Sequence, residues 1–505
     1  MKLKRTENTI RNVFYGTAYK FVCIIGPFAV RTVMIYIMGN EYVGLGSLFT
    51  SILSFLSLAE LGVGSALVFS MYKPIAEDDI AMINALYHLY KKIYRIIGSI
   101  IFVIGVGIVP FLSKLVGTDL PPDTNLYILY AIYLFNTILS YWVYGYKQAL
   151  LIAFQRSDII SKRSLIIQLI MYIAQISCLY ITRNYYVYII NLPIATIITN
   201  IANKIIVDKM FPQYKCQGKV SKEVELSIKK NVLALFGTKA NSIVLHATDN
   251  IVISAFLGLA IVGKYGNYYY IMNSVAAFLK MIYSSITAGL GNSLETESIN
   301  KNYSIFKALS FLNAWIVMFC SCCLLCLYQP FMKIWVKDKN MFGLDVVILL
   351  VVYFYTYMIR RIILTYKDAA GIWWEDRFRP YAVMIINLGL NVLLCQAIGI
   401  CGIIISTIIS MLVAIPWENY TVFKYVFKKG QRQYYIEMLS YFLISVILCF
   451  GTGLVCSKFP YSVLFLFVRL AVCVVIPNAV WMILFCKKDE YTYAKRIFMQ
   501  IKNHV

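Results

Sequence analysis

Long apolar runs, separated by short polar segments, follow one another along the whole chain. Nearly all of them reach about 20 residues, the length that an α-helix needs to cross the hydrocarbon core of a membrane. The pattern predicts fourteen membrane-spanning helices and leaves no segment for a soluble domain. The expected spans are 14–38, 43–70, 96–112, 125–146, 164–181, 185–206, 231–257, 265–290, 305–328, 344–364, 380–396, 401–424, 434–456 and 462–486.

The longest polar connection, at 208–231, follows the sixth span and divides the chain. We therefore expect two six-helix lobes followed by a last pair of helices. The expected boundaries are 1–206 for the N-terminal lobe, 207–230 for a cytoplasmic linker, 231–428 for the second lobe, and 429–505 for helices 13 and 14 with a basic cytoplasmic tail.

The second set of six spans resembles the first when the chain is shifted by 219 residues. This shift aligns Gly39 with Gly258 and Gly44 with Gly263, and both pairs bracket the turn of a helical hairpin. An even number of spans in each copy gives the two copies the same orientation. The sequence therefore predicts a parallel, pseudo-two-fold repeat of the kind found in two-bundle transporters.

Composition and charge agree with a membrane protein. The chain is 60% hydrophobic and 14% charged, against about 45–50% and about 25% in soluble domains. The chain has 47 lysine and arginine residues, of which only seven fall in outer loops and five within spans. The rest lie in the inner loops and the two termini, and they carry most of the net charge of +23. Such an excess marks the cytoplasmic side and places both termini there. A nucleic-acid partner is not expected, because its binding patch would cluster on one surface.

Ionisable residues deep in the spans are the first candidates for function. Basic groups outnumber acidic ones there, and a cationic, water-filled cavity suits an anionic head group. Arginine favours bidentate phosphate contacts and lysine acts as a point charge. Glu418 lies near an inner helix end and is expected to reach water. The deep basic residues are Lys20, Arg31, Lys239, Lys280 and Arg469, and the deep acidic ones are Glu60 and Asp249.

Arg31 and Asp249 lie at similar depths, about 12–13 Å below the outer turns. The repeat alignment sets Arg31 opposite Asn250, beside Asp249. One hypothesis is an Arg31–Asp249 pair across a central cavity, and the alternative is that each residue is satisfied within its own bundle. His246 is either a protonation switch or a packed, hydrogen-bonded side chain.

Lys20 and Lys239 lie near the inner interface, where they either snorkel to the phosphate level or belong to polar helix faces. Glu60 lies in the apolar stretch "LSLAELGVGSALVFSMYKP". We interpret it as a buried counter-charge for Lys20 in its own lobe or for Lys280 across the cavity, as part of an inner gate. The Gly-x-Gly that follows it is expected to permit close packing or a bend.

Thirteen cysteines raise the question of a metal or disulfide. The densest group, "CSCCLLC" at 320–326, lies in an apolar span, where cysteine behaves as a small hydrophobe, and it lacks a paired C-x2-C zinc spacing. No metal and no cofactor are therefore expected. A polytopic glycosyltransferase or polymerase is disfavoured as well, because the outer loops are short and contain no catalytic motif.

The stretch "VRTVMIYIMGNEYVGLGSLFTSILSFLSLAELGVGSALVFSMYKPIAEDD" closely resembles the start of polysaccharide-transport (Wzx-like) flippases of the multidrug/oligosaccharidyl-lipid/polysaccharide (MOP) exporter superfamily. The resemblance implies an all-α, V-shaped, MATE-like fold of two bundles. It implies that the first, second, seventh and eighth helices line the cavity, where Arg31, Glu60, Asp249 and Lys280 fall. By analogy with lipid II flippases, Arg469 would face a lipid-tail groove.

The expected function is export of undecaprenyl-pyrophosphate-linked oligosaccharide across the bacterial cytoplasmic (inner) membrane by alternating access, for surface polysaccharide. The partners implied are the lipid-linked anionic glycan, membrane lipid, and a polymerase with other polysaccharide-assembly proteins. Coupling to protons, sodium or the membrane potential stays open. The alternative is a cation-coupled small-molecule exporter of the same superfamily, although such a protein would favour an acidic cavity.

Overall fold

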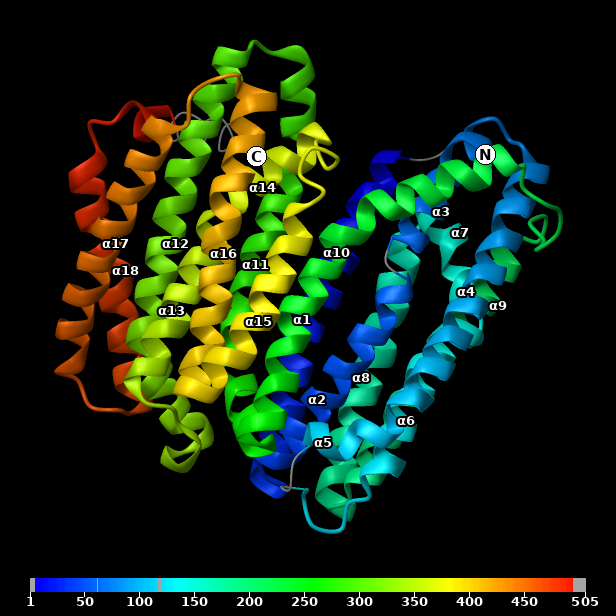
Figure 1. Cartoon of the computed structure of the whole chain (residues 1–505), viewed down its shortest axis with the longest axis horizontal. Coiled ribbons are helices and arrows are strands. Elements are labelled where there is room, and N and C mark those ends of the chain that lie inside the picture. The colour runs from blue at the N-terminus through cyan, green and yellow to red at the C-terminus, as the bar shows by residue number, and fades with distance from the viewer. Residues whose placement is uncertain (1–4, 61, 117–119, 494–505) are drawn as a thin grey trace. The chain divides into compact units, whose positions relative to one another are not determined.

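The computed structural model describes residues 5–60, 62–116 and 120–493, and these residues form helices without any β-strand (Figure 1). Twelve helices among them are long and apolar enough to cross a membrane, and a pair bent by 43° adds a thirteenth if it counts as one span. The chain is a multi-pass, all-α membrane protein.

Large apolar side chains face outward along the helices. Ile181 is 81% exposed, Ile385 is 72% exposed and Ile483 is 73% exposed, each on a different long helix. A soluble protein does not leave so many large apolar groups in contiguous contact with water. These outer faces therefore fit contact with lipid chains.

Two expected spans are not single straight helices, and they account for the difference from fourteen. The second span consists of α2 (Asn40–Leu56), a 3-10 turn (Ser57–Glu60) and α3 (Val63–Ala76). Gly62, at the start of α3, has a φ of 86°, a left-handed conformation that glycine adopts without strain. The fourth span bends between α6 (Leu126–Trp142) and α7 (Gln148–Ala153).

Several long helices begin at a side chain that caps the free backbone N–H groups of the first turn. Serine, asparagine and aspartate suit this position because their oxygen atoms accept those hydrogen bonds. The capping residues are Asp79, Asn125, Asn184, Ser221, Ser298 and Ser462.

The first compact unit runs from Met1 to Gly263. Within it α1 packs along α8, and α10 packs against α2 and α3. The sequence predicts α10 as the first helix of the second lobe, whereas its contacts with α2 and α3 lie within the first unit. The lobe boundaries stay a prediction. The first unit contains α2, α3, α6 and α7. Its other helices are α1 (Arg5–Ile37), α4 (Ile80–Ile108), α5 (Leu112–Val116), α8 (Ser157–Thr182), α9 (Tyr185–Met210) and α10 (Lys222–Leu257).

Two glycines that the internal repeat aligns contact each other in this unit. A Cβ on Gly44 would lie 2.0 Å from the carbonyl oxygen of Leu259, and a Cβ on Gly263 would lie 2.1 Å from that of Asn40. Asn40 and Leu259 are equivalent in the same alignment. A reciprocal contact of this kind is what segments related by a two-fold axis make.

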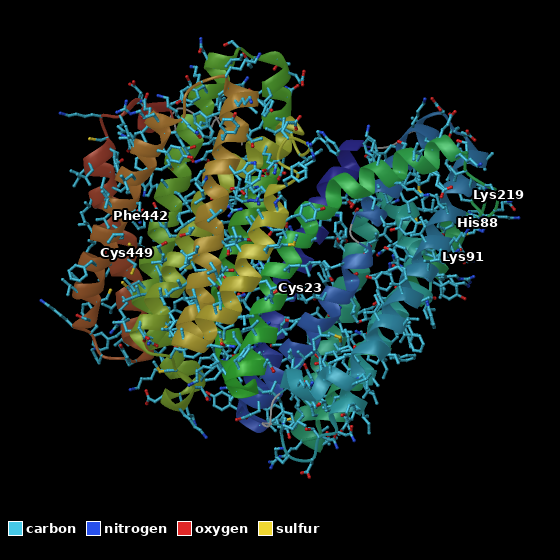
Figure 2. The ribbon with its side chains drawn as sticks, viewed as in Figure 1. Cys23, His88, Lys91, Lys219, Phe442 and Cys449 are labelled. Atoms are coloured by element: carbon cyan, nitrogen blue, oxygen red, sulfur yellow. The ribbon has the colours of Figure 1, made fainter. Side chains whose placement is uncertain are left out.

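The polar connection after α9 docks on α4. The backbone N–H of Lys215 donates to Asn84 Oδ1 at 2.7 Å, and His88 Nδ1 lies 2.8 Å from the carbonyl oxygen of Gly218. Figure 2 shows His88, Lys91 and Lys219 together at this end of the unit. The connection is therefore held by specific polar contacts rather than hanging freely.

The second compact unit runs from Lys264 to Val505. α12 is its central helix and packs against α13, α17 and α18. An aromatic core of Phe311, Tyr441, Trp481 and Phe485 joins α12 to the last two helices. The helices of this unit are α11 (Leu259–Thr296, after its first turn), α12 (Ile299–Val336), α13 (Leu344–Ile359), α14 (Arg361–Ala370), α15 (Arg379–Ile398), α16 (Ile400–Val422), α17 (Arg432–Ser457) and α18 (Val463–Phe485).

Candidate functional site

A cavity of about 460 Å³ opens within the first unit, a volume in the range of small-molecule sites. Six helices supply its wall: α1, α2, α6, α8, α9 and α10. The lining residues are Pro27, Val30, Arg31, Met34, Tyr42, Val43, Gly46, Ser47, Thr50, Ser51, Tyr133, Met171, Tyr172, Gln175, Tyr185, Tyr188, Leu192 and Asn250. We call this space the unit 1 cavity.

Arg31 brings the positive charge to the unit 1 cavity. Among the described residues that line the cavity, it alone carries a full charge at neutral pH. Its Nη2 donates to Ser47 Oγ at 3.3 Å, and that hydroxyl in turn donates to the carbonyl oxygen of Val43 at 2.8 Å. The guanidinium is thus held beside a hydroxyl of the cavity wall.

Five tyrosines form one side of the cavity. The hydroxyls of Tyr133 and Tyr185 lie 3.2 Å apart, and the Tyr185 hydroxyl donates to the carbonyl oxygen of Tyr42 at 3.3 Å. The rings of Tyr185 and Tyr188 stack with centroids 5.5 Å apart. Together with Tyr172 they present flat apolar faces next to hydroxyl groups, which is the combination that a sugar ring can contact.

Asn250, which the repeat alignment sets opposite Arg31, also lines the cavity. Its Nδ2 donates to Ser51 Oγ at 2.9 Å, which ties α10 to α2. The neighbouring Asp249 is buried, with 2% of its surface exposed. The Arg31–Asp249 pair, and the roles of all three residues in binding or gating, stay predictions.

Glu60 lies outside the cavity, at the break between α2 and α3. Its carboxylate accepts hydrogen bonds from the hydroxyls of Tyr94 at 3.0 Å and Tyr141 at 3.4 Å. Lys239 is close enough to act on it electrostatically and donates to Ser65 Oγ at 3.0 Å. Glu60 is therefore a hydrogen-bonded carboxylate in its own unit, and its pairing with Lys20 or Lys280 stays a prediction.

The other sequence candidates lie in different surroundings. Lys20 is exposed and His246 is half-buried. Lys280 Nζ lies 4.6 Å from the ring centroid of Tyr357, a cation–π contact. Arg469 is buried, with 3% of its surface exposed, and donates to two backbone carbonyl groups. None of these four lines the unit 1 cavity.

Glu418 corrects one expectation, because it does not reach water. It is fully buried, and its Oε1 lies 2.7 Å from Arg360 Nη2 and 2.8 Å from Arg379 Nη1. Arg379 also pairs with Asp376, which pairs with Lys367. We call these five residues of the second unit the buried ion cluster. Glu418 on α16 lies 58 residues from Arg360, at the end of α13, and this distance along the sequence concealed their contact.

Sequence reasoning missed several polar residues of the unit 1 cavity. Tyr172 and Gln175 lie three residues apart on α8, and Tyr185 and Tyr188 have the same spacing on α9. That spacing places each pair on one helix face. It was a usable signal, but tyrosine is neutral and the chain contains 40 of them, so a packing role was the simpler interpretation.

No protein-family model and no curated protein matches the chain. Several solved structures match the chain. "Lipid II flippase MurJ, inward closed conformation" aligns with a TM-score of 0.67 over 94% of this chain and 99% of that chain, at 14% identity. "Inward-facing conformation of a multidrug resistance MATE family transporter of the MOP superfamily" aligns with a TM-score of 0.61 over 80% and 94%, at 12% identity. The chain has the fold of the MOP exporter superfamily.

A third structure, "Crystal structure of MATE in the bent conformation", aligns with a TM-score of 0.54 over 83% of this chain and 95% of that chain, at 13% identity. The expected fold class is confirmed. The Wzx-like family within the superfamily stays a prediction.

Proposed function

We propose that this MOP-fold protein is a flippase that moves undecaprenyl-pyrophosphate-linked oligosaccharide units across the bacterial cytoplasmic membrane by alternating access. The observation that supports the proposal is the unit 1 cavity, where one arginine lines the wall together with hydroxyl, amide and tyrosine groups. A guanidinium suits a pyrophosphate, and the tyrosine wall suits a sugar.

In this proposal Arg31 holds the phosphate of the substrate while the glycan passes along the tyrosines and the prenyl tail stays in lipid. Lys20, Lys239 and Lys280 would meet the head group at other stages of transport, and Asn250 would donate hydrogen bonds to it. Glu60, Asp249 and His246 would serve the gates or the coupling ion. Membrane lipid and polysaccharide-assembly proteins, including a polymerase, are the proposed partners.

Replacing Arg31 tests the proposal. Arg31→Ala should reduce surface polysaccharide about tenfold to a hundredfold, because a charge-assisted hydrogen bond contributes about 1.5–3 kcal/mol. Arg31→Lys should retain part of the activity, since it keeps the charge but loses the bidentate fork. The measurement is polysaccharide export in cells whose own flippase is deleted, together with the amount of protein in the membrane.

Arg183→Ala is the matched control, because Arg183 is an exposed arginine directly after α8 and is not among the residues that line the cavity. Normal export in Arg31→Ala cells with normal protein levels would contradict the proposal. A loss in both variants would point to general damage rather than to phosphate binding.

One observation favours a second candidate, a cation-coupled small-molecule exporter. Asp249 is a buried carboxylate directly beside the cavity residue Asn250, and buried acidic groups in spans are typical of ion-coupled transport. In that case Asp249→Asn should abolish efflux of cationic compounds. Polysaccharide export should then be unaffected by Asp249→Asn and by the Arg31 variants. A drug-accumulation assay separates the two functions.

A further inference from the structure

Three cysteines from three helices of the second unit converge in its interior. Cys326 comes from α12, Cys456 from the end of α17 and Cys473 from α18, and they are 4%, 1% and 0% exposed. Their Sγ atoms all lie within 4.8 Å of one another. Cys323 packs against the edge of this group. We call Cys326, Cys456 and Cys473 the thiol triad.

A buried guanidinium accompanies the thiol triad. Arg469 lies one turn before Cys473 on α18 and is 3% exposed. Its Nη atoms donate to the carbonyl oxygens of Cys326 and Phe459, but its Nε is buried without a hydrogen-bond partner. Within the described residues no carboxylate forms an ion pair with it, and it is close enough to act electrostatically on Cys456.

A buried charge without a counter-charge is costly. The ring centroid of Tyr461 lies 4.9 Å from the Arg469 guanidinium, a cation–π contact that supplies no negative charge. Thiols also converge beside Arg469, and a thiol becomes an anion when it binds a metal ion. Two thiolates, one thiol and a monovalent cation carry one negative charge in total, which the guanidinium cancels. The arrangement is therefore neutral as a whole, as burial among apolar helices requires.

The geometry suits a soft ion. Metal–sulfur bonds are about 2.3 Å long, so three sulfur atoms around one ion lie about 4 Å apart. The thiol triad needs only a small side-chain rotation to reach that spacing. Thiolates select Cu(I) and Zn(II) among biological ions, but Zn(II) in a structural site takes four ligands. Three converging thiols match Cu(I) better.

A further pair of thiols and a cavity lie next to the part of α12 that carries the triad. Cys322, one turn from Cys326 on α12, has its Sγ 3.2 Å from that of Cys449 on α17. Cys449 lines a cavity of about 210 Å³ together with Phe442, and Figure 2 labels both residues on α17. A soft ion could therefore pass from this cavity to the triad along thiols.

We propose that Cys326, Cys456 and Cys473 bind one Cu(I) ion, with Arg469 as the counter-charge, and that the ion fastens α17 and α18 to α12. Binding releases the protons of two thiols and changes no oxidation state. The proposal rests on the second unit alone and is independent of the proposed transport function.

Metal titration of the purified full-length protein tests the site. The reduced protein in lipid nanodiscs is titrated anaerobically with Cu(I) against the chromophoric chelator bicinchoninate. We expect one equivalent of Cu(I) to be withheld from the chelator and X-ray absorption to show only sulfur neighbours at about 2.3 Å. Failure to withhold Cu(I), nitrogen or oxygen neighbours, or displacement of Cu(I) by equimolar Zn(II) would overturn the proposal.

Variants locate the ion. Cys456→Ser combined with Cys473→Ser should weaken Cu(I) binding about a hundredfold or more, and Arg469→Gln about tenfold. Cys395→Ser is the control, because Cys395 is also buried but lies on α15 outside the triad. Undiminished binding in the double variant would overturn the proposal. The absorption spectrum of the unaltered protein decides the question even where the double variant does not fold.

Discussion

At the residue scale, oppositely charged or hydroxyl partners stabilise charged side chains inside the helical bundle. The buried ion cluster combines Lys367, Arg360 and Arg379 with Asp376 and Glu418. Three cations share two carboxylates, so each carboxylate serves two partners. Such a cluster costs desolvation when it forms, and losing one member leaves the others buried and unpaired.

Glu418 offers a direct test of the buried ion cluster. Glu418→Ala should lower the free energy of unfolding by about 3–5 kcal/mol, because it leaves Arg360 and Arg379 without their shared carboxylate. Unfolding of the purified protein in mixed micelles measures the change. Glu295→Ala, at an exposed position on α11, should change stability by less than about 0.5 kcal/mol. Equal stability of the two variants would contradict a structural role for the cluster.

At the element scale, glycines decide where helices break and how closely they approach. Gly39 and Gly258 each precede a helix with positive φ values of 112° and 87°, so the two hairpin turns of the repeat share one backbone conformation. Gly44 and Gly263 then bring the first turns of α2 and α11 into backbone contact. Small residues at such crossings permit packing that larger side chains would prevent.

Gly44→Ala tests this crossing. The new Cβ would meet the carbonyl oxygen of Leu259 at 2.0 Å, so the backbones must separate. We expect a loss of about 1–3 kcal/mol of stability, the usual cost of overpacking. Gly389→Ala on α15 is the control, because nothing lies within 4 Å of a Cβ there. A thermal-unfolding comparison that ranks the two variants equally would contradict the contact.

At the scale of the whole molecule, the distribution of charge sets the orientation in the membrane. Most of the 47 basic residues fall on one side of the expected spans. The cost of moving such charges across the bilayer keeps them in the cytoplasm. The connection after α9 and both termini should therefore face inward.

Labelling with a membrane-impermeant maleimide tests the orientation. Lys114→Cys should react in intact cells, whereas Lys219→Cys should react only after the membrane is permeabilised; both positions are exposed. The unaltered protein gives the background, to which Cys216 contributes little because burial raises the pKa of its thiol. Reaction of Lys219→Cys in intact cells would contradict the predicted topology, because it would place the connection after α9 outside the cell.

Hydropathy and charge, which are local properties, were enough to predict most of the helical elements and two members of the unit 1 cavity. Each of the twelve uninterrupted spans corresponds to an expected apolar run, because burial in lipid requires a continuous hydrogen-bonded helix with apolar side chains. Arg31 is singled out because a charged group in a span is costly without a purpose, and Asn250 because the internal repeat sets it opposite Arg31.

Only the tertiary structure decided which distant residues meet. The tyrosine wall of the unit 1 cavity, the partners of Glu60 and of Glu418, and the thiol triad all join side chains from helices far apart in the chain. Spacing along one helix cannot reveal which distant helices meet, and at the thiol triad each helix contributes a single ligand. By itself the sequence determined an all-helical membrane protein with charges at depth, and helix packing determined what those charges and thiols contact.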